Sequence, residues 1–284
     1  MQVQHVFDPR TNTLTYVVWD ESTGDAVVID PVLDFDPAVG RVWTESADAV
    51  AAFATEHDLT VHWLLETHAH ADHLSGAQTL AARLGARVAI SERIREVQAT
   101  FAPVFSADHI ALDGSQFDRL LADGETLEAG SLRVGVLHTP GHTPACASFH
   151  IDDAVFTGDA LFLPDFGTGR CDFPAGSAED LYRSVAETLY ALPDETRVFV
   201  GHDYQPDGRE LRWETTIGDS KRDNIQLRGD TRQADFVRFR TDRDATLSAP
   251  RLLLPSIQVN IDAGRLPPAG PDGKQHLKLP LKVS

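Results

Sequence analysis

Cysteine is almost absent from this chain of 284 residues, which contains only Cys146 and Cys171. Two thiols are too few for the network of disulfides that stabilises small secreted proteins. We therefore expect both thiols to be reduced, with Cys146 in the core and Cys171 in a loop. The same scarcity leads us to expect a cytoplasmic protein.

Long apolar runs are also missing. No stretch approaches the roughly 20 apolar residues that a membrane-spanning helix requires. Residues 1–7 lack the basic region and the apolar core of a secretory signal. The sequence therefore predicts no membrane partner, in keeping with a cytoplasmic location.

Positive charge is in deficit, because 25 Lys and Arg residues stand against 43 Asp and Glu residues, a formal net charge of −18. A phosphate backbone would repel such a chain, so we expect no nucleic-acid partner. A small anionic substrate stays compatible with this charge, since it meets only the local field of its site. The composition leaves the oligomeric state open, a homodimer included.

Internal repeats and low-complexity segments are absent as well. A chain of this length can form one large α/β domain with a full core. Proline and glycine cluster most strongly at 266–273, which we interpret as an irregular loop before a short closing segment at 277–283. We predict a single domain over 1–284, with 206–284 packed on it as a carboxy-terminal extension.

Histidine, by contrast, is concentrated at one point of the chain. The segment T-H-A-H-A-D-H at 67–73 directly follows the apolar run 61–65. Imidazole is the commonest metal ligand, and His68 and His70 project to the same side of an extended chain. A polar loop that caps the next helix is the alternative, but a cap needs one acceptor rather than four donors. The segment therefore predicts a metal site.

Three more strand-like runs, 132–137, 155–157 and 198–200, end in polar residues. The residues that follow these runs and carry metal-binding or acid–base groups are His138, His142, Asp159, His202 and Asp203. One His or Asp after a strand is usually a turn residue. Four strand ends that together supply several such groups indicate a site built at one edge of a rigid scaffold.

The ordered motifs H-x-H-x-D-H, P-G-H-T, T-G-D and G-H-D resemble the metallo-β-lactamase fold superfamily over roughly residues 1–205. The resemblance implies an α/β fold, a four-layer αββα sandwich of two mixed β-sheets with helices on the outer faces and a metal groove at one edge. Hydrophobic periodicity agrees with this fold. It predicts strands at 14–19 and 26–29 and helices at 47–55, 74–84 and 178–192.

Within this superfamily the chain looks like the persulfide dioxygenases, also called sulfur dioxygenases. The matching elements are T-G-D-A-L at 157–161, G-T-G-R-C-D-F at 167–173, L-Y-R-S at 181–184 and H-D-Y at 202–204. The chain departs from that pattern in two places. The segment 163–166 is about two residues longer than in the family, and the region 210–284 is unlike the family's short carboxy-terminal tail. It also resembles the bacterial branch called β-lactamase-like hydrolases.

The resemblance implies one Fe(II) per chain, held by His68, His142 and Asp159. Two imidazoles and one carboxylate on one face are typical of non-haem iron oxygenases. The implied reaction oxidises glutathione persulfide with dioxygen to sulfite and glutathione. The groups that would orient ligands and hold water are His70, Asp72, His73 and His202.

Arg170 and Tyr204 are the candidates for binding the glutathione moiety. A guanidinium suits a carboxylate, and a phenol can donate to a carbonyl or thiolate. The alternative for Arg170 is a structural ion pair with Asp172 or Asp165.

A binuclear hydrolase, such as a thioesterase similar to glyoxalase II or a lactonase, is the rival interpretation. Two Zn(II) ions would generate a hydroxide nucleophile. The ligands would be His68, His70 and His142 for one ion, Asp72, His73 and His202 for the other, and Asp159 as a bridge. The loop 169–173 and the lack of an obvious basic helical region at the carboxy terminus argue against glyoxalase II. A non-catalytic metal-binding member is the third possibility, which the full donor set disfavours.

Overall fold

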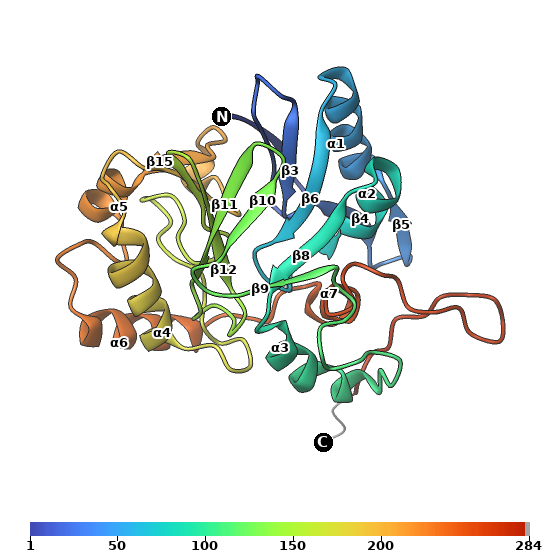
Figure 1. The fold of residues 1–284 in the computed structure, drawn as a ribbon. Helices are drawn as coiled ribbons and strands as arrows, with labels where there is room; N and C mark the ends of the chain where they lie inside the picture. Colours follow the sequence, from blue (N-terminus) through green and yellow to red (C-terminus); the bar gives the residue numbers. More distant parts are fainter. Residues whose placement is uncertain (282–284) are drawn as a thin grey trace.

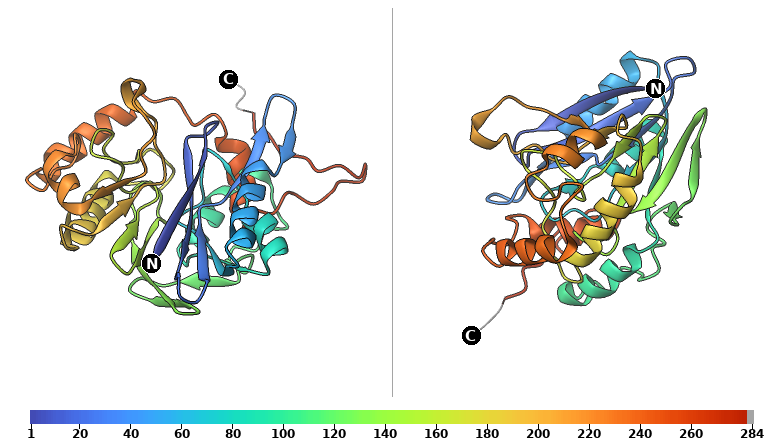
Figure 2. Two further views of the ribbon diagram at one scale, coloured as in Figure 1. Left: turned by 90° about the horizontal axis from the view of Figure 1, so that it is seen from above. Right: turned by 90° about the vertical axis from the view of Figure 1, so that its left-hand side faces the viewer.

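The computed structural model describes residues 1–281, and Figure 1 shows two β-sheets packed face to face between outer helices. Residues 282–284 lie outside the described part of the chain. They are the end of the expected domain and of its extension, and 282 and 283 also end the expected closing segment 277–283. The views in Figure 2 show the same layering from two other sides. The expected αββα architecture is therefore confirmed.

The first sheet has six strands in the order β1-β2-β3-β6-β8-β9. Strand β2 pairs antiparallel with β1 and β3, whereas β3, β6, β8 and β9 pair in parallel. The strands are β1 Gln2–Asp8, β2 Thr13–Trp19, β3 Asp25–Ile29, β6 Thr60–Glu66, β8 Arg87–Ser91 and β9 Arg119–Leu121.

The second sheet has six strands in the order β10-β11-β12-β13-β14-β15, with only the β13/β14 pair parallel. They are β10 Thr126–Ala129, β11 Leu132–His138, β12 Ala147–Ile151, β13 Ala154–Phe156, β14 Arg197–Phe199 and β15 Glu214–Thr216. A small third sheet joins β4 Val32–Asp36, β5 Arg41–Trp43 and β7 Leu74–Ser75.

Helices cover both outer faces. Beside the first sheet lie α1 Glu45–Glu56, α2 Ala77–Leu84 and α3 Ile94–Phe101; beside the second lie α4 Ala178–Arg183, α5 Ile217–Asp223 and α6 Gln233–Asp244. Helix α7 Leu253–Asn260 lies next to β7, on the side of the first sheet. Shorter helical turns are η1 Pro103–Phe105, η2 Ser184–Thr188, η3 Leu189–Ala191 and η4 Pro206–Gly208. None of the helices within residues 1–281 combines the length and the apolar composition needed to span a membrane.

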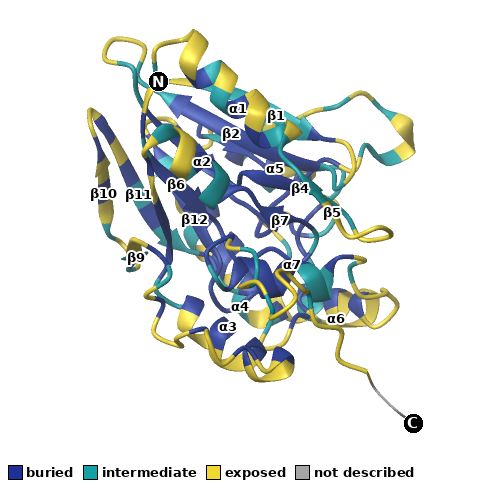
Figure 3. Ribbon diagram, turned by 90° about the vertical axis from the view of Figure 1, so that its right-hand side faces the viewer, coloured by how far each residue is buried: buried dark blue, intermediate teal, exposed yellow. Residues whose placement is uncertain are grey.

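Alternation along the strands divides the apolar side chains between two cores. In β2, Leu14, Tyr16 and Val18 pack between the two sheets, whereas Val17 faces the layer of α1 to α3. Figure 3 shows the buried strands inside and the exposed helix faces outside. Full burial of one such side chain stabilises the fold by about 1.5–3 kcal/mol.

Two expected helices differ in detail from the structure. The helix predicted over 74–84 begins only at Ala77, because Leu74 and Ser75 pair with β4 as strand β7. The helix predicted over 178–192 is helical over 178–191, but α4 passes into the wider π-turn of η2 and then the tighter η3, and Leu192 is extended. Pairing with a neighbouring strand overrides local helical spacing in the first case.

Residues 206–281 connect the two helical layers. Helices α5 and α6 lie in the layer outside the second sheet, and α6 packs against α4. The chain then crosses to α7 beside β7, next to the first sheet. This crossing passes the edge at which the strands β6, β13 and β14 end, which is where the candidate site lies.

Candidate metal centre

The four strand ends that the sequence singles out meet at one edge of the sandwich. The loop 67–73 follows β6, His142 lies in the loop after β11, Asp159 follows β13, and His202 follows β14. The His and Asp side chains are largely buried, with His68 only 1% and His202 only 2% exposed. The fold thus brings together residues that lie more than a hundred positions apart in the sequence.

His68 is oriented by a chain of two hydrogen bonds. Its Nδ1 lies 3.0 Å from the Thr67 hydroxyl oxygen, and that hydroxyl donates to Asp30 Oδ2 at 2.8 Å. Because the hydroxyl proton is used on the carboxylate, the hydroxyl accepts from His68 Nδ1–H. The lone pair of His68 Nε2 is therefore left for the centre of the site.

His142 is oriented in the same manner by a backbone carbonyl. Its Nδ1 lies 2.7 Å from the carbonyl oxygen of Arg170, which can only accept, so Nδ1 carries the proton. The other ring nitrogen, Nε2, lies 3.5 Å from Asp159 Oδ2. Hydrogen bonds of this kind fix the tautomer and the ring direction of metal-binding histidines.

The chemistry of these donors fits a metal ion. One ligand atom each from His68, His142 and Asp159 can be chosen so that all three lie within 4.8 Å of one another. Within residues 1–281, His68 Nε2 is buried without a hydrogen-bond partner, and the same holds for His70 Nδ1 and His73 Nε2. Buried nitrogens are rarely left unpaired. A bound cation would satisfy them.

A second compact group consists of His70, Asp72 and His73, whose ligand atoms also lie within 4.8 Å of one another. Next to it, His202 Nε2 lies 3.4 Å from Asp72 Oδ2 and 3.3 Å from Asp159 Oδ1. The donors that the sequence assigns to a second metal are therefore gathered beside the first group. Their presence leaves the number of metals open.

His70 also faces two buried carboxylates behind it. Its Nε2 lies 3.1 Å from Asp30 Oδ1 and 3.4 Å from Glu66 Oε2, as an ion pair rather than a well-aligned hydrogen bond. Burial lowers the pKa of His70, but the two carboxylates outweigh it and raise that pKa well above its usual value. Burial and the neighbouring imidazoles lower the pKa of His68, which keeps His68 neutral and able to bind a cation.

Close backbone approaches explain two glycines of the motifs. Gly158 has a φ of +48°, and a side chain there would come within 2.5 Å of the Thr67 hydroxyl oxygen. At Gly169 a Cβ would lie 2.0 Å from the Asp159 carbonyl oxygen. Only glycine allows the loops that carry Asp159 and Arg170 to pack so tightly.

Arg170 forms the structural ion pair with Asp172 that was the alternative to substrate binding. Its Nε and Nη2 donate to the two oxygens of Asp172 at 2.5 and 2.6 Å, and Nη1 donates to the Ser248 carbonyl at 2.8 Å. Asp165 pairs instead with Arg209, which also holds both oxygens of Asp203 at 2.7 Å. The three nitrogens of the Arg170 guanidinium are thus all engaged in contacts within the protein.

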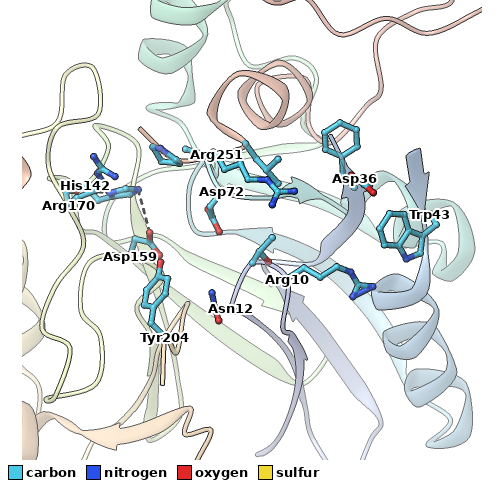
Figure 4. A pocket seen from close by; sticks show the side chains of 15 residues that line it. Arg10, Asn12, Asp36, Trp43, Asp72, His142, Asp159, Arg170, Tyr204 and Arg251 are labelled. Carbon is cyan, nitrogen blue, oxygen red and sulfur yellow. Dashed lines mark hydrogen bonds and ion pairs between the residues drawn. The ribbon is translucent and has the colours of Figure 1, made fainter. Parts of the chain in front are cut away.

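Tyr204 lies beside the donors, stacked at 4.5 Å on Phe166 and at 5.4 Å on His202. It lines a cavity of about 620 Å³ together with His142, Asp159 and Arg170. Figure 4 shows this cavity with the labelled side chains around it. A volume of this size suits a small-molecule ligand.

Several residues that support the site are missing from the sequence-based set. Asn260 in α7 donates to the carbonyl oxygens of His70 and His73, both at 2.8 Å, and accepts from Ser75 N–H at 2.8 Å. Nothing in the sequence around Asn260 signals this contact. Asp30 could have been found, because it is an acidic residue directly after the strand β3, and Asp159 likewise comes shortly after β13.

Helix α6 supports the loop that carries Arg170. Asp244 Oδ2 accepts from the Cys171 N–H at 2.7 Å, and Asp244 Oδ1 accepts from Arg240 Nη2 at 2.6 Å. Arg240 Nη1 also lies 3.3 Å from the Gly169 carbonyl oxygen. Because the Arg170 carbonyl directs His142, this buried pair acts on the site through the loop.

The fold and this arrangement of donors agree with the comparisons with known proteins. The sequence profile of the metallo-β-lactamase superfamily matches residues 8–202. The chain belongs to the metallo-β-lactamase superfamily. The recognition made from the motifs is thereby confirmed, and the members of this superfamily share its αββα fold.

Individual relatives carry different names. A probable metallo-hydrolase of Burkholderia pseudomallei is 48% identical over 99% of this chain and 99% of its own length. The mitochondrial persulfide dioxygenase ETHE1 of Homo sapiens is 32% identical over 71% of this chain and 68% of its own. The crystal structure of ETHE1 from Myxococcus xanthus superposes with a TM-score of 0.75 and 33% identity over 93% of this chain and 100% of its own. This chain spans 65% of the length of related β-lactamase hydrolase-like proteins.

Proposed function

We propose that this superfamily member is a non-haem iron persulfide dioxygenase that oxidises glutathione persulfide to sulfite and glutathione. The observation that carries the proposal is the compact group of two imidazoles and one carboxylate from His68, His142 and Asp159. Such a set leaves the remaining coordination positions for substrate and dioxygen. The similarity to the persulfide dioxygenase of Homo sapiens supports the same reaction.

The overall reaction balances without a further co-reactant. Glutathione persulfide, dioxygen and water give glutathione, sulfite and two protons, as the outer sulfur loses four electrons to dioxygen and the S–S bond breaks. When bound, Fe(II) would supply this redox chemistry. The substrate thiol is regenerated, so one persulfide and one dioxygen are consumed for each sulfite formed.

The chain itself contributes orientation and solvent exclusion. The Thr67 hydroxyl and the Arg170 carbonyl hold the protons of His68 Nδ1 and His142 Nδ1, so that both Nε2 atoms can bind metal. Tyr204, stacked beside the donors, would donate its phenol proton to the bound sulfur or to a carbonyl of the tripeptide. The donors are largely buried, and His142 and Asp159 line the cavity from which a substrate would approach.

A binuclear hydrolase is the second candidate, favoured by the compact group of His70, Asp72 and His73. In that case two Zn(II) ions would activate water against a thioester or lactone. The name of the relative from Burkholderia pseudomallei is in line with hydrolysis.

Assays of one preparation with two substrates separate the candidates. We expect protein purified anaerobically with iron to consume dioxygen with glutathione persulfide and to leave S-lactoylglutathione intact. Oxygen uptake on an electrode and thioester loss by absorbance give both rates. Hydrolysis of S-lactoylglutathione without persulfide-dependent oxygen uptake would refute the dioxygenase proposal and support the hydrolase.

A further inference from the structure

The cavity beside the metal centre has a wall that comes from the carboxy-terminal region. Pro250, Arg251 and Leu252, directly before α7, line the same cavity of about 620 Å³ as His142 and Asp159. Figure 4 shows the Arg251 side chain reaching into this space. A ligand that occupies this cavity beside the metal donors therefore shares it with the Arg251 side chain.

The other two arginines of the cavity are already neutralised. Arg10 lies 3.2 Å from Asp8 Oδ1 and 3.1 Å from Asp34 Oδ1, and it also contacts Glu45. Arg170 makes its two-pronged pair with Asp172. Each of these cations has its charge balanced by carboxylates of the protein itself.

Arg251 differs from both. Over residues 1–281 its side chain makes no hydrogen bond to another residue, and no carboxylate lies within ion-pair distance. It is an exposed cation on the wall of a cavity whose acidic groups are Asp36, at the end of β4, and Asp72 and Asp159, at the metal centre. The chain as a whole has a net charge of −18 and would repel anions. An arginine without a neighbouring carboxylate, in the cavity beside the metal donors, instead provides a local positive charge that attracts them.

The start of α7 adds positive potential on the same wall. The helix spans Leu253–Asn260, and Leu252 at its cap position makes no side-chain cap. The N–H groups of its first turn are mostly used, since Leu253 N–H donates to Pro250, Ser256 N–H donates to Leu252 and Pro255 has none, which leaves that of Leu254. An unmatched N–H group at a helix start carries a partial positive charge that favours anions. The guanidinium and the helix start therefore favour the same kind of ligand group.

We propose that Arg251 is a substrate-binding residue that receives a carboxylate of the substrate, at the part of the molecule remote from the reacting sulfur. The inference rests on the proposed function and deepens it, because glutathione carries two carboxylates and one reactive sulfur. Arg170, bound to Asp172, then serves mainly to direct His142 through its carbonyl. The carboxy-terminal region thereby takes part in substrate selection.

Direct binding tests the proposal without any turnover. Reduced glutathione is titrated calorimetrically into the metal-loaded wild type and into the variants Arg251→Ala, Arg251→Lys and Arg238→Ala. We expect the dissociation constant to rise about tenfold in Arg251→Ala, as for loss of one exposed charge-assisted bond. Lysine should restore part of the affinity, because it keeps the charge but not the planar fork. Arg238, exposed on α6 and paired with Asp235, is the matched control and should bind like wild type.

Turnover adds a second readout. In Arg251→Ala we expect a higher KM for glutathione persulfide with unchanged kcat and metal content, and no change for the persulfide of 2-mercaptoethanol, which has no carboxylate. Equal glutathione binding by wild type and Arg251→Ala, or no binding by wild type, would overturn the inference. Weakened glutathione binding in Arg251→Ala by a protein that does not oxidise persulfide would support the inference while refuting the dioxygenase function.

Discussion

Asn260 bonds to the backbone of His70, which lies 190 positions earlier in the chain, with 2.8 Å between Asn260 Nδ2 and the His70 carbonyl oxygen. The same amide nitrogen bonds to the carbonyl of His73. One side chain of α7 thus holds the loop that carries four of the candidate metal donors. Asn260 therefore supports the metal-binding loop although it lies beyond residue 205.

Replacing Asn260 should therefore weaken metal binding. Asn260→Ala leaves two buried carbonyls and the Ser75 N–H without partners, and we expect the free energy of unfolding of the metal-free protein to fall by about 2–3 kcal/mol. Metal affinity, measured by competition with a chelator, should fall about ten- to a hundredfold.

Gln258 provides the control on the same helix, because its amide bonds to Leu254 and Lys278, away from the metal loop. Gln258→Ala should lower stability but leave metal affinity unchanged. Equal metal affinity in Asn260→Ala and wild type would show that the loop does not depend on this contact.

The buried pair of Arg240 and Asp244 should behave as a unit. Removal of either partner leaves a buried charge, so Arg240→Met or Asp244→Leu alone should lower the free energy of unfolding by about 3–5 kcal/mol. The double variant should be more stable than either single one, because it leaves no uncompensated charge. Urea unfolding of the four proteins measures this coupling, and additive effects of the two changes would contradict it.

The metal ligands can be separated by substitution. His142→Ala and Asp159→Ala should each lose metal and activity, because they remove donors of the compact group. His202→Ala should keep most of its iron, since the mononuclear proposal gives this residue only a role in orienting ligands and water. Metal content by mass spectrometry of each purified variant tests this difference. An equal loss in all three variants would instead favour the binuclear site.

Both cysteines should be unreactive in the folded protein. Burial raises the pKa of Cys146 to about 12 and raises the pKa of Cys171 strongly as well. At pH 8 both thiols stay protonated, and only the thiolate attacks a disulfide reagent. We expect negligible reaction with such a reagent in buffer and two thiols per chain after unfolding in urea. Rapid reaction of one thiol in buffer would show that its burial is incomplete.

The sequence predicts the sandwich and the gathering of donors because those features are local. Each strand shows its own apolar alternation, and each donor follows a strand end, so the edge of the sheet can be inferred without coordinates. The expected buried position of Cys146 is likewise found. The loop cysteine, Cys171, is also buried, because α6 covers its loop through Asp244.

Contacts between distant parts of the chain cannot be predicted from local sequence patterns. Asn260, Arg240 and Arg251 lie in segments whose local sequence resembles ordinary surface or helix sequence, and their importance arises only where the chain crosses the sheet edge. The pairing of Arg170 with Asp172 was foreseen only as an alternative, since spacing alone cannot decide between a substrate and a neighbouring carboxylate. The division into one domain with an extension over 206–284 stays a prediction.

Metal content and reaction stoichiometry, measured on one sample, distinguish a mononuclear iron dioxygenase from a binuclear zinc hydrolase. Protein purified anaerobically with iron is analysed for metals and then given glutathione persulfide in an oxygen electrode, with sulfite quantified at the end. We expect about one iron ion per chain and about one sulfite formed per dioxygen consumed. Two zinc ions per chain, with no oxygen uptake and with hydrolysis of S-lactoylglutathione, would contradict it.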